Sequence, residues 1–406
     1  MKKTVCELFA GVGGFRVGLE RLNSGWSTVW FSQWEPGASK QWAHECYVSH
    51  FGDIKDLAGE YTTGIDVAQV NKKNIPDHTL VVGGFPCQDY SVAHTLASSK
   101  GLQGKKGVLW WQIYEILKAK KTPFCLFENV DRLLKSPAKQ RGRDFGVMLS
   151  CLHSLGYVVE WRVINAAEYG AAQRRRRTFI FAYNKNTNHY KTTKKTSLED
   201  ILLRDGFFAS TFPIRSNEAI REGKVSKDVE NISNDFKFDF GNAGIMRDGK
   251  IVTTKATPME EKAITLGKIL ENKKVDDSFF ISDEKMPKWT YLKGAKRIER
   301  TSAAGYKYVF SEGPIAFPDP WDKPSRTMLT SESTLNRSTH VVEDRKTKKL
   351  RLITPIEAER LQGFEDNWTN TGMPQRMRYF CMGNALVTHM ITRMGRTLDN
   401  IIDAEE

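Results

Sequence analysis

The sequence of 406 residues lacks the features that mark membrane, secreted and zinc-binding proteins. No apolar run approaches the roughly 20 residues that span a bilayer, so we expect no membrane partner. The six cysteines form no CxxC pair and have no metal-ligand spacing, which predicts no metal site and free thiols in a reducing compartment. Glu7 and the glycine-rich turn after it interrupt the apolar start of the chain, which argues against a signal peptide.

The charge balance points to the class of partner. Lysine and arginine total 61 against 48 aspartates and glutamates, a formal net charge of +13 at pH 7. Such an excess favours a polyanion, most simply nucleic acid, because binding to phosphates provides long-range attraction. A basic surface that only keeps the protein solvated is the alternative interpretation.

The first 185 residues alternate between strand and helix patterns, which predicts an α/β fold with a mostly parallel sheet and helices on both faces. The polar, charged stretch from Asn184 to about Asp322 shows no such rhythm, and we expect a second, smaller and irregular domain there. The alternation then returns with two predicted helices. Expected strands are Thr4–Phe9, Thr28–Ser32, 79–84, Pro123–Phe127, Tyr157–Val163 and Thr178–Tyr183; expected helices are Phe15–Leu22, Ala38–His50, Val108–Lys120, Phe145–Leu155, Pro355–Gln362 and Leu386–Leu398.

Pro86-Cys87 follows one of these strands, and Glu128-Asn129-Val130 ends the next. A helix is predicted between the two strands, which makes a right-handed parallel unit whose strand ends share one edge of the sheet. Ligands bind at that edge in open α/β sheets. A thiol and a carboxyl group that face one crevice suggest covalent chemistry, whereas the other five cysteines fit buried free thiols.

A glycine-rich turn, Phe9-Ala-Gly-Val-Gly-Gly-Phe15, joins the first strand to the first helix. Its glycines allow positive φ and a close ligand approach, but it has neither the dinucleotide pattern nor a phosphate loop. We therefore expect a nucleoside cofactor without pyrophosphate. Gln33-Trp34-Glu35 follows the second strand, where an acid suits ribose hydroxyls and an indole can stack on a purine. A tight structural turn and a solvated surface are the respective alternatives.

Gln173-Arg-Arg-Arg-Arg177 directly precedes the strand Thr178–Tyr183. Alternate side chains of an extended segment point the same way, so Gln173, Arg175 and Arg177 are expected to share a face. If the strand returns antiparallel, its start lies at the edge that carries Cys87 and Glu128. A generic basic patch is the alternative.

The order of these motifs resembles the DNA (cytosine-5) methyltransferase family. The resemblance covers residues 1–185 and about 324–398 and rests on eight motifs in order. They are Phe-Ala-Gly-x-Gly-Gly-Phe (9–15), Gly-Asp-Ile (52–54), Gly-Phe-Pro-Cys-Gln (84–88), Glu-Asn-Val (128–130), Gln-x-Arg-x-Arg (173–177), Pro-Ser-Arg-Thr-Met (324–328), Arg-Leu-Ile-Thr-Pro-x-Glu-x-x-Arg-Leu-Gln-Gly-Phe (351–364) and Gly-Asn-Ala (383–385).

The resemblance implies methyl transfer from S-adenosylmethionine to C5 of a flipped-out cytosine in double-stranded DNA, through a Cys87 adduct at C6. It implies a catalytic and cofactor domain over 1–185, a target-recognition domain over 186–323, and a segment 324–406 that returns to the catalytic domain. Implied catalytic residues are Cys87, Glu128, Arg175 and Arg177; cofactor residues are Phe9, Gly11, Gly13, Gly14, Phe15, Gln33, Trp34, Glu35, Asp53, Ile54, Pro86, Leu109, Asn384 and Ala385; DNA-binding residues are Gln88, Ser91 and Gln173.

The chain departs from the family pattern in places that leave roles open. Glu7 stands where the family usually has Asp, and the usual ribose-binding Glu falls on Gln33, so either Gln33 or Glu35 holds the ribose. The segment around Leu109 also differs. An RNA cytosine-5 methyltransferase on the same scaffold and a catalytically silent DNA-binding regulator are the rival functions. We expect a monomeric, cytoplasmic enzyme of bacterial or phage origin, associated with the nucleoid, with a restriction endonuclease as a candidate partner.

Overall fold

The computed structural model describes residues 1–85, 109–302 and 305–405, and the chain divides into two compact units. The chain leaves unit 1 twice to form unit 2. Unit 1 comprises Met1–Tyr169, Arg176–Glu261 and Thr388–Glu406, and unit 2 comprises Gly170–Arg175 and Lys262–Val387. None of the helices in the described ranges is long and apolar enough to cross a bilayer.

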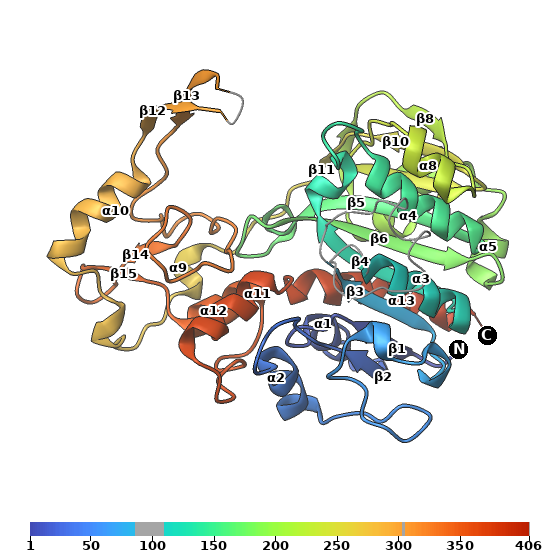
Figure 1. Ribbon diagram of the computed structural model, residues 1–406, viewed down its shortest axis with the longest axis horizontal. Coiled ribbons are helices and arrows are strands. Elements are labelled where there is room, and N and C mark those ends of the chain that lie inside the picture. The colour runs from blue at the N-terminus through green and yellow to red at the C-terminus, as the bar shows by residue number, and fades with distance from the viewer. Residues whose placement is uncertain (86–108, 303–304, 406) are drawn as a thin grey trace. The chain divides into compact units, whose positions relative to one another are not determined.

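Unit 1 is built on a sheet that has nine strands within the described residues, in the order β2-β1-β3-β4-β6-β5-β9-β10-β8 (Figure 1). The first four of these are parallel, and the later pairs are antiparallel. The predicted α/β fold class is confirmed. The strands are β1 (Thr4–Leu8), β2 (Ser27–Ser32), β3 (Leu80–Gly84), β4 (Phe124–Val130), β5 (Tyr157–Asn165), β6 (Arg176–Asn184), β8 (Arg221–Lys224), β9 (Ala243–Arg247) and β10 (Lys250–Thr254).

Helices cover both faces of this sheet because its central strands are apolar on both sides. The face that carries Cys6 and Val81 packs against α3 (Leu109–Lys120) and α4 (Arg143–Ser154) in one continuous core. The opposite face carries α1 (Gly14–Glu20) and α13 (Thr388–Asp403). The other helices of unit 1 are α2 (Trp42–Phe51), α5 (Asn188–Thr193), α6 (Leu198–Asp200), α7 (Phe207–Thr211) and α8 (Val229–Asp235).

The last helix, α13, belongs to unit 1 and packs there on α1. Thr392 Oγ1 donates to the carbonyl oxygen of Gly18 in α1 at 2.8 Å. A Cβ at Gly18 would lie 2.5 Å from the side chain of Ile391, so glycine is needed where the two helices touch. Buried residues recur along one face of α13, which is the pattern of an amphipathic surface helix.

The compact units do not divide where the charge pattern placed the domain boundaries. Residues 186–261, expected in the second domain, belong to unit 1, and 324–387 belong to unit 2. β9 pairs with β5 and extends the sheet. It joins β10 through Asp248-Gly249, both with positive φ, and such an Asp-Gly turn is a strong hairpin signal. The charged residues around it obscured this hairpin signal. A separate two-stranded sheet of β7 (Ile214–Asn217) and β11 (Ala256–Pro258) also belongs to unit 1.

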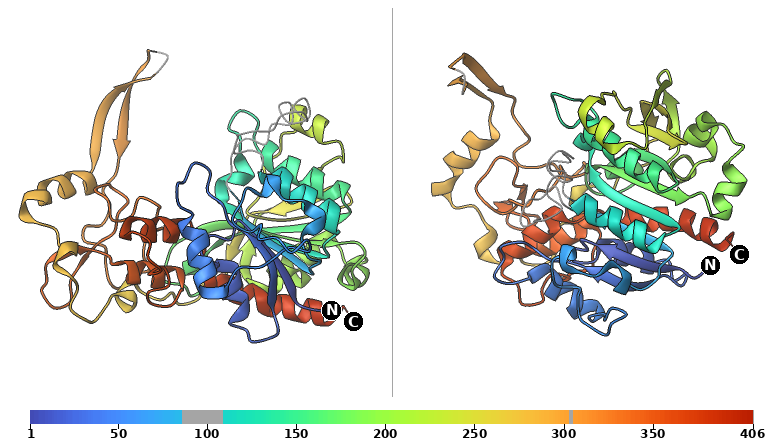
Figure 2. Two further views of the ribbon diagram at one scale, coloured as in Figure 1. Left: turned by 60° about the horizontal axis from the view of Figure 1, so that its bottom comes forward. Right: turned by 45° about the vertical axis from the view of Figure 1, so that its right-hand side comes forward.

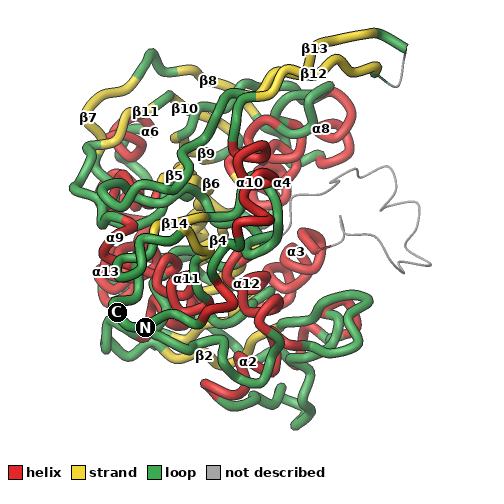
Figure 3. The backbone as a smooth tube through the Cα atoms, turned by 90° about the vertical axis from the view of Figure 1, so that its left-hand side faces the viewer, coloured by secondary structure: helices red, strands yellow, loops and turns green. Residues whose placement is uncertain are grey.

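Unit 2 is organised around buried charge. Figure 3 draws its backbone, with helices in red and strands in yellow. Arg351 has no exposed side-chain surface and donates to both carboxylate oxygens of Glu357 at 2.8 Å. Glu357 also completes a capping box with Thr354 at the start of α11, whose predicted bounds are confirmed. The elements of unit 2 are α9 (Leu266–Ile269), α10 (Met286–Lys293), β12 (Lys296–Thr301), β13 (Lys307–Glu312), β14 (Val341–Glu343), β15 (Leu350–Leu352), α11 (Pro355–Gln362) and α12 (Gln375–Asn384).

The pairing of β9 with β5 should depend on Gly244, which faces Trp161 across the ladder. A Cβ at Gly244 would lie 2.0 Å from the indole, so Gly244→Ala forces the strand or the ring to shift. We expect the free energy of unfolding to fall by about 1–3 kcal/mol, measured from the urea midpoint. Gly313→Ala is the control, since its Cβ would meet nothing within 4 Å. Equal losses in the two variants would contradict this account.

Candidate active site

The carboxyl ends of β3 and β4 bring the predicted catalytic carboxylate to the end of the strand that leads to Cys87. Gly84 is the register partner of Glu128. A Cβ on Gly84 would lie 3.0 Å from Glu128 Oε2, so the carboxylate lies directly over the glycine. Cys87 itself, with Pro86, Gln88 and Ser91, lies outside the described residues, and only Gly84 and Phe85 lead toward it. The predicted common edge of the two strands is confirmed.

Arg177 joins Glu128 at this edge. β6 is antiparallel to β4, and Arg177 is the register partner of Val130. The Arg177 Nε donates to Glu128 Oε1 at 2.8 Å, with 18% and 13% of the two side chains exposed. A charged pair that is mostly screened from water is costly to separate unless a ligand replaces the lost contacts. The return of the basic strand to the Glu128 edge, expected from the sequence, is confirmed.

Asn129 belongs to the Glu-Asn-Val motif (128–130), but the sequence predicts no role for it. Its side chain is buried, donates to the carbonyl oxygen of Phe85 at 2.9 Å and accepts from the Val130 amide at 2.9 Å. It therefore ties the end of β4 to the backbone that leaves β3. Phe85 also packs against Trp110 and Phe127. These contacts make Asn129 a positioning residue for the segment that continues to Cys87.

Gln173 and Arg175 lie in unit 2 and make their contacts there. Arg175 is buried, and its guanidinium donates to the carbonyl oxygens of Met328 at 3.1 Å and Gly383 at 2.9 Å. Gln173 accepts from the Met328 amide at 2.9 Å. A Cβ at Gly383 would lie 2.4 Å from the Thr330 amide nitrogen, so a backbone crossing explains that glycine. The predicted substrate contacts of Gln173 and Arg175 stay predictions.

The glycine-rich turn has the strained backbone that its sequence predicted. Phe9, Gly11 and Gly13 all have positive φ. A Cβ at Gly11 would meet nothing within 4 Å, whereas one at Gly13 would lie 2.7 Å from the Phe51 ring. Gly13 therefore serves packing, and Gly11 leaves open space beside the backbone. Gly14 and Phe15 begin α1 and are buried.

Glu7 lies beneath this turn, fully buried. Its carboxylate accepts from the Tyr47 hydroxyl at 2.9 Å and from the backbone amides of Arg16, at 3.4 Å, and Phe15. Burial raises the pKa of Glu7 to about 7, although Tyr47 and Arg16 oppose that rise. Glu7 accepts from two backbone amides at the start of α1, so these amides are not available to bind a phosphate. This agrees with the prediction of a nucleoside cofactor without pyrophosphate.

Contacts at the end of β2 distinguish Gln33 from Glu35, the two residues predicted to bind the ribose. Gln33 is buried, and its Oε1 accepts from the Gly11 amide at 2.7 Å, so its amide group braces the glycine-rich turn. Glu35 is half-buried, and burial raises the pKa of its carboxyl group. Trp34, between them, is 39% exposed.

Thr63 is a residue that the sequence did not single out. It is buried, and its hydroxyl donates to Asp53 Oδ1. Its carbonyl oxygen accepts from the backbone N–H of Gln33 at 2.9 Å. Because the hydroxyl proton goes to Asp53, the nitrogen His44 Nε2, 2.9 Å away, donates to Thr63. Thr63 thus links the loop of Asp53 and Ile54 to the end of β2. No motif signals this role, since a single threonine in a loop carries no pattern.

The remaining predicted residues are placed as follows. Leu109 begins α3 and packs, half-buried, against the core. Asn384 ends α12 and is exposed, and Ala385 caps that helix; both belong to unit 2. Among the described residues, no group of three or more histidine, cysteine, aspartate or glutamate side chains is placed to hold a metal ion.

Comparison with known proteins decides the family. The family model for C-5 cytosine-specific DNA methylases matches residues 3–400. The chain belongs to this family. As a DNA (cytosine-5) methyltransferase it is 49% identical to Type II methyltransferase M.Sau3AI of Staphylococcus aureus over 406 residues, covering 98% of this chain and 96% of the relative. It is 26% identical to Type II methyltransferase M.SsoII of Shigella sonnei, covering 98% and 80%.

Solved structures support the methyltransferase fold. The chain is similar to the Dnmt2 methyltransferase of S. pombe, with a TM-score of 0.60, 13% identity, and coverage of 100% of this chain and 99% of the other. It is also similar to the Entamoeba histolytica methyltransferase EhMeth, with a TM-score of 0.58, 16% identity and coverage of 100% of both chains. At these identities the likeness establishes the fold only.

The buried carboxyl of Glu7 should make the stability of this methyltransferase depend on pH. The pKa of Glu7 is about 7 in the folded protein against 4.5 ordinarily, so the folded state binds more protons between these values. Stability therefore falls as pH rises through that window, by up to about 3 kcal/mol for this group. Glu7→Gln should flatten the fall, measured by urea unfolding across the window.

Glu160 provides the matched control. It is buried, accepts from the amides of Phe207 and Phe208, and its pKa is also raised to about 7 by burial. Glu160→Gln should flatten the profile by a similar amount, and the double variant by more than either. An unchanged pH profile in Glu7→Gln would show that Glu7 titrates normally.

Proposed function

We propose that this enzyme methylates C5 of a cytosine flipped out of a specific duplex DNA sequence, through a covalent adduct between Cys87 and C6. The observation that carries the proposal is the Glu128–Arg177 pair over Gly84, three residues before Cys87 in the chain. Cytosine C5 is a poor nucleophile. Addition of a thiolate to C6 makes C5 enamine-like, and a thiolate is both a strong nucleophile and a good leaving group.

Glu128 and Arg177 have complementary tasks in this scheme. The carboxyl group of Glu128, when protonated, donates to N3 and also bonds the exocyclic amine, which favours addition at C6. Arg177 binds O2 of the base and the neighbouring phosphate. Their 2.8 Å ion pair supports the assignment, because it holds both groups at one strand edge before any base arrives. After methyl transfer a base removes the C5 proton, and elimination of the thiolate restores the aromatic ring.

Base flipping is part of the same proposal, because the assigned contacts require it. Hydrogen bonds to N3, O2 and the amine address the pairing edge of cytosine, which the partner strand covers in a duplex. The base must therefore leave the stack, at a cost of a few kcal/mol. We assign Gln88 and Ser91, close to Cys87 in sequence, to contacts with the DNA backbone that offset this cost.

The residues of the glycine-rich turn fit S-adenosylmethionine. The open space beside Gly11, the amides of α1 taken up by Glu7, and the acids at Glu35 and Asp53 suit a nucleoside without pyrophosphate. When bound, this cofactor supplies an electrophilic methyl group on a sulfonium. We assign the ribose to Glu35, because Gln33 is engaged with the turn, and the adenine face to Trp34. Pro86, Leu109, Asn384 and Ala385 stay as further proposed cofactor contacts.

Target recognition, proposed for 186–323, divides between the two units. Residues 186–261 extend the sheet of unit 1, whereas 262–323 lie in unit 2. We assign recognition of the DNA sequence to 262–323, because this part of the chain carries exposed basic and aromatic side chains. It adds no described strand to the large sheet of unit 1. A monomeric enzyme with a companion restriction endonuclease, in the cytoplasm and on the nucleoid, is part of the same proposal.

Duplex DNA and transfer RNA should be assayed side by side, because the rival on this scaffold modifies RNA. We expect methylation of DNA alone, and bisulfite sequencing of DNA from cells that express the chain should reveal one methylated sequence. Methylation of transfer RNA without methylation of DNA would overturn the proposed substrate.

Cofactor affinity should depend on Trp34. If its exposed indole stacks on the adenine, Trp34→Ala should weaken S-adenosylmethionine binding by about 1–2 kcal/mol in calorimetry. Tyr61→Ala, which removes another exposed aromatic ring of unit 1, should leave the dissociation constant unchanged. An unaltered affinity in Trp34→Ala would remove the indole from the site.

The covalent step predicts a trapped complex. A 5-fluorocytosine at the target position cannot lose fluorine as a cation, so methyl transfer should leave enzyme and DNA permanently joined. We expect a denaturation-resistant adduct that requires S-adenosylmethionine and maps by mass spectrometry to the peptide containing Cys87. Cys87→Ser should bind DNA and form no adduct.

The other cysteines serve as controls for this experiment. Cys6 and Cys125 are buried, and desolvation raises the pKa of both thiols strongly. They should therefore stay unmodified under the trapping conditions. An adduct that survives Cys87→Ser, or that maps to Cys6 or Cys381, would overturn the mechanism and leave the fold assignment intact.

A further inference from the structure

A chain of hydrogen bonds at the carboxyl end of β2 joins three separate segments of unit 1. Gln33 follows β2, and its Oε1 accepts from the Gly11 amide at 2.7 Å. The backbone N–H of Gln33 donates to the Thr63 carbonyl oxygen at 2.9 Å, and the Thr63 hydroxyl donates to Asp53 Oδ1. The chain therefore runs from the glycine-rich turn, through Gln33 and Thr63, to the start of the loop after α2.

The loop over residues 52–66 depends on such contacts because it contains no helix or strand. It lies with α2 beside β2, the edge strand of the large sheet, in the blue part of Figure 2. Asp56, which is buried, orders its outer turn by accepting from the amides of Ala58 at 2.9 Å and Glu60 at 3.1 Å. Thr63 attaches the loop to the end of β2.

His44, on α2, fixes the direction in which the Thr63 hydroxyl donates. Its Nε2 lies 2.9 Å from Thr63 Oγ1 and donates to it, because the hydroxyl proton goes to Asp53. The imidazole stacks on Phe31 with the ring centroids 5.6 Å apart, and a Cβ at Gly64 would lie 3.0 Å from it. Burial lowers the pKa of His44, so the ring is neutral near pH 7. A closely packed, neutral donor therefore holds the hydroxyl in one orientation.

These contacts use only one oxygen of the Asp53 carboxylate. Oδ1 accepts from the Thr63 hydroxyl and from the backbone N–H of Ile54, the latter at 2.8 Å. Oδ2 accepts no hydrogen bond from any residue in the described ranges. Asp53 is half-buried, and each carboxylate oxygen can accept about two hydrogen bonds. The carboxylate is thus fixed through one oxygen and open to a ligand through the other.

We propose that Thr63 and His44 are positioning residues for S-adenosylmethionine, which hold Asp53 so that Oδ2 accepts from a hydrogen-bond donor of the cofactor. The inference rests on the proposed function, which places Asp53 and the glycine-rich turn in the cofactor site. Thr63 acts on both, because its carbonyl oxygen holds the Gln33 backbone and the Gln33 side chain holds Gly11. The site is therefore ordered before the cofactor arrives, and less conformational freedom is lost on binding.

Calorimetry of S-adenosylmethionine binding tests the role of the Thr63 hydroxyl. Thr63→Val keeps the shape of the side chain but removes the donor to Asp53, and we expect the affinity to fall about 10-fold. Thr63→Ser should bind as tightly as the wild type, because it restores the hydroxyl. His44→Phe keeps a ring against Phe31 but cannot donate, and should weaken binding less than Thr63→Val does. His44→Gln, which can donate, should recover the affinity.

A double-mutant cycle shows whether Thr63 acts through Asp53. Asp53→Ala should weaken cofactor binding by itself, and Thr63→Val should add no further loss in the Asp53→Ala background. The loss in Thr63→Val should be equal for S-adenosylmethionine and S-adenosylhomocysteine, because both molecules carry the donor groups that Oδ2 can bind. In methylation assays the KM for S-adenosylmethionine should rise by the same factor, and kcat should stay unchanged.

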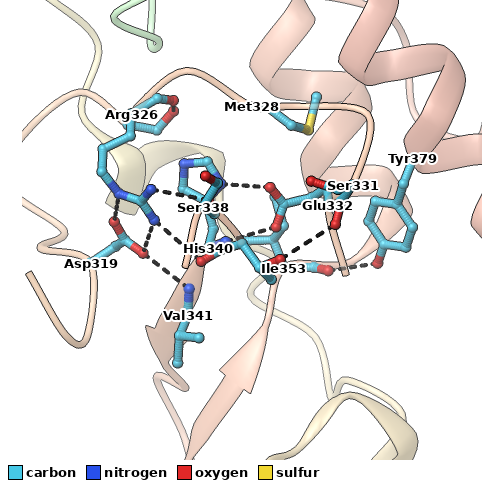
Figure 4. A network of polar contacts seen from close by, with 12 residues as sticks. Asp319, Arg326, Met328, Ser331, Glu332, Ser338, His340, Val341, Ile353 and Tyr379 are labelled. Carbon is cyan, nitrogen blue, oxygen red and sulfur yellow. Dashed lines mark hydrogen bonds and ion pairs between the residues drawn. The ribbon is translucent and has the colours of Figure 1, made fainter. Parts of the chain in front are cut away.

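Thr339→Val is the matched control for the loss of a buried threonine hydroxyl. Thr339 lies in unit 2, and its Oγ1 donates to a backbone carbonyl oxygen at 2.6 Å. Its segment is also firmly held, because Arg326 donates to the Thr339 carbonyl oxygen at 3.3 Å, in the network that Figure 4 shows, and Arg337 donates to the carbonyl oxygen of Leu292 at 3.0 Å. Both Thr63→Val and Thr339→Val should lower the thermal midpoint, but Thr339→Val should leave cofactor affinity unchanged.

The outcomes separate this inference from the proposed function. Wild-type affinity in Thr63→Val, additive losses in the cycle, or an equal loss in Thr339→Val would each overturn the positioning role and leave cytosine methylation standing. An enzyme that binds S-adenosylmethionine with the expected losses but methylates no cytosine would overturn the proposed function and leave the positioning role intact. A wild-type protein that binds no S-adenosylmethionine would overturn both.

Discussion

The position of Glu128 over Gly84 is the contact on which the chemistry of the sheet edge depends. Parallel pairing of β3 and β4 places the two residues side by side, and the absence of a side chain at Gly84 lets the carboxylate lie across the neighbouring strand. The antiparallel return of β6 then adds Arg177 at the same edge. Three strands from separate parts of the chain thus converge on one polar group, and the shared ladder, more than any loop, sets its geometry.

Buried arginines organise much of unit 2. Arg175, Arg326 and Arg351 each lie mostly out of water and donate to carbonyl or carboxylate oxygens. Removal of one partner from such a pair costs about 3–5 kcal/mol, because the remaining charge is left buried. Arg326 and Arg351 belong to motifs that the resemblance carries, and their contacts show that those motifs maintain the architecture of unit 2.

Strong local patterns predicted the helices and central strands, and the right-handed parallel unit predicted that Glu128 and the Cys87 segment share an edge. Other features depend on contacts that no local pattern encodes. Gln33 and Glu35 could not be separated, because only the folded turn brings Gly11 to the Gln33 side chain. The division of 186–323 between the two compact units could not be predicted, since β9 pairs with β5 over a long separation within a charged stretch. Thr63 and Arg337 likewise act through distant backbone atoms.

The discontinuous path of unit 1 has a consequence for its synthesis. α13 packs on α1 through Gly18 and Thr392, yet the whole of residues 262–387 separates it from the rest of unit 1 in the chain. During synthesis on the ribosome, the side of α1 that packs on α13 therefore stays uncovered until residues 262–387 and then α13 have emerged. The helix that carries the glycine-rich turn gains its full packing last. A nascent chain would thus complete unit 2 before unit 1, and a product that ends before α13 would contain all of unit 2 beside an incompletely packed unit 1.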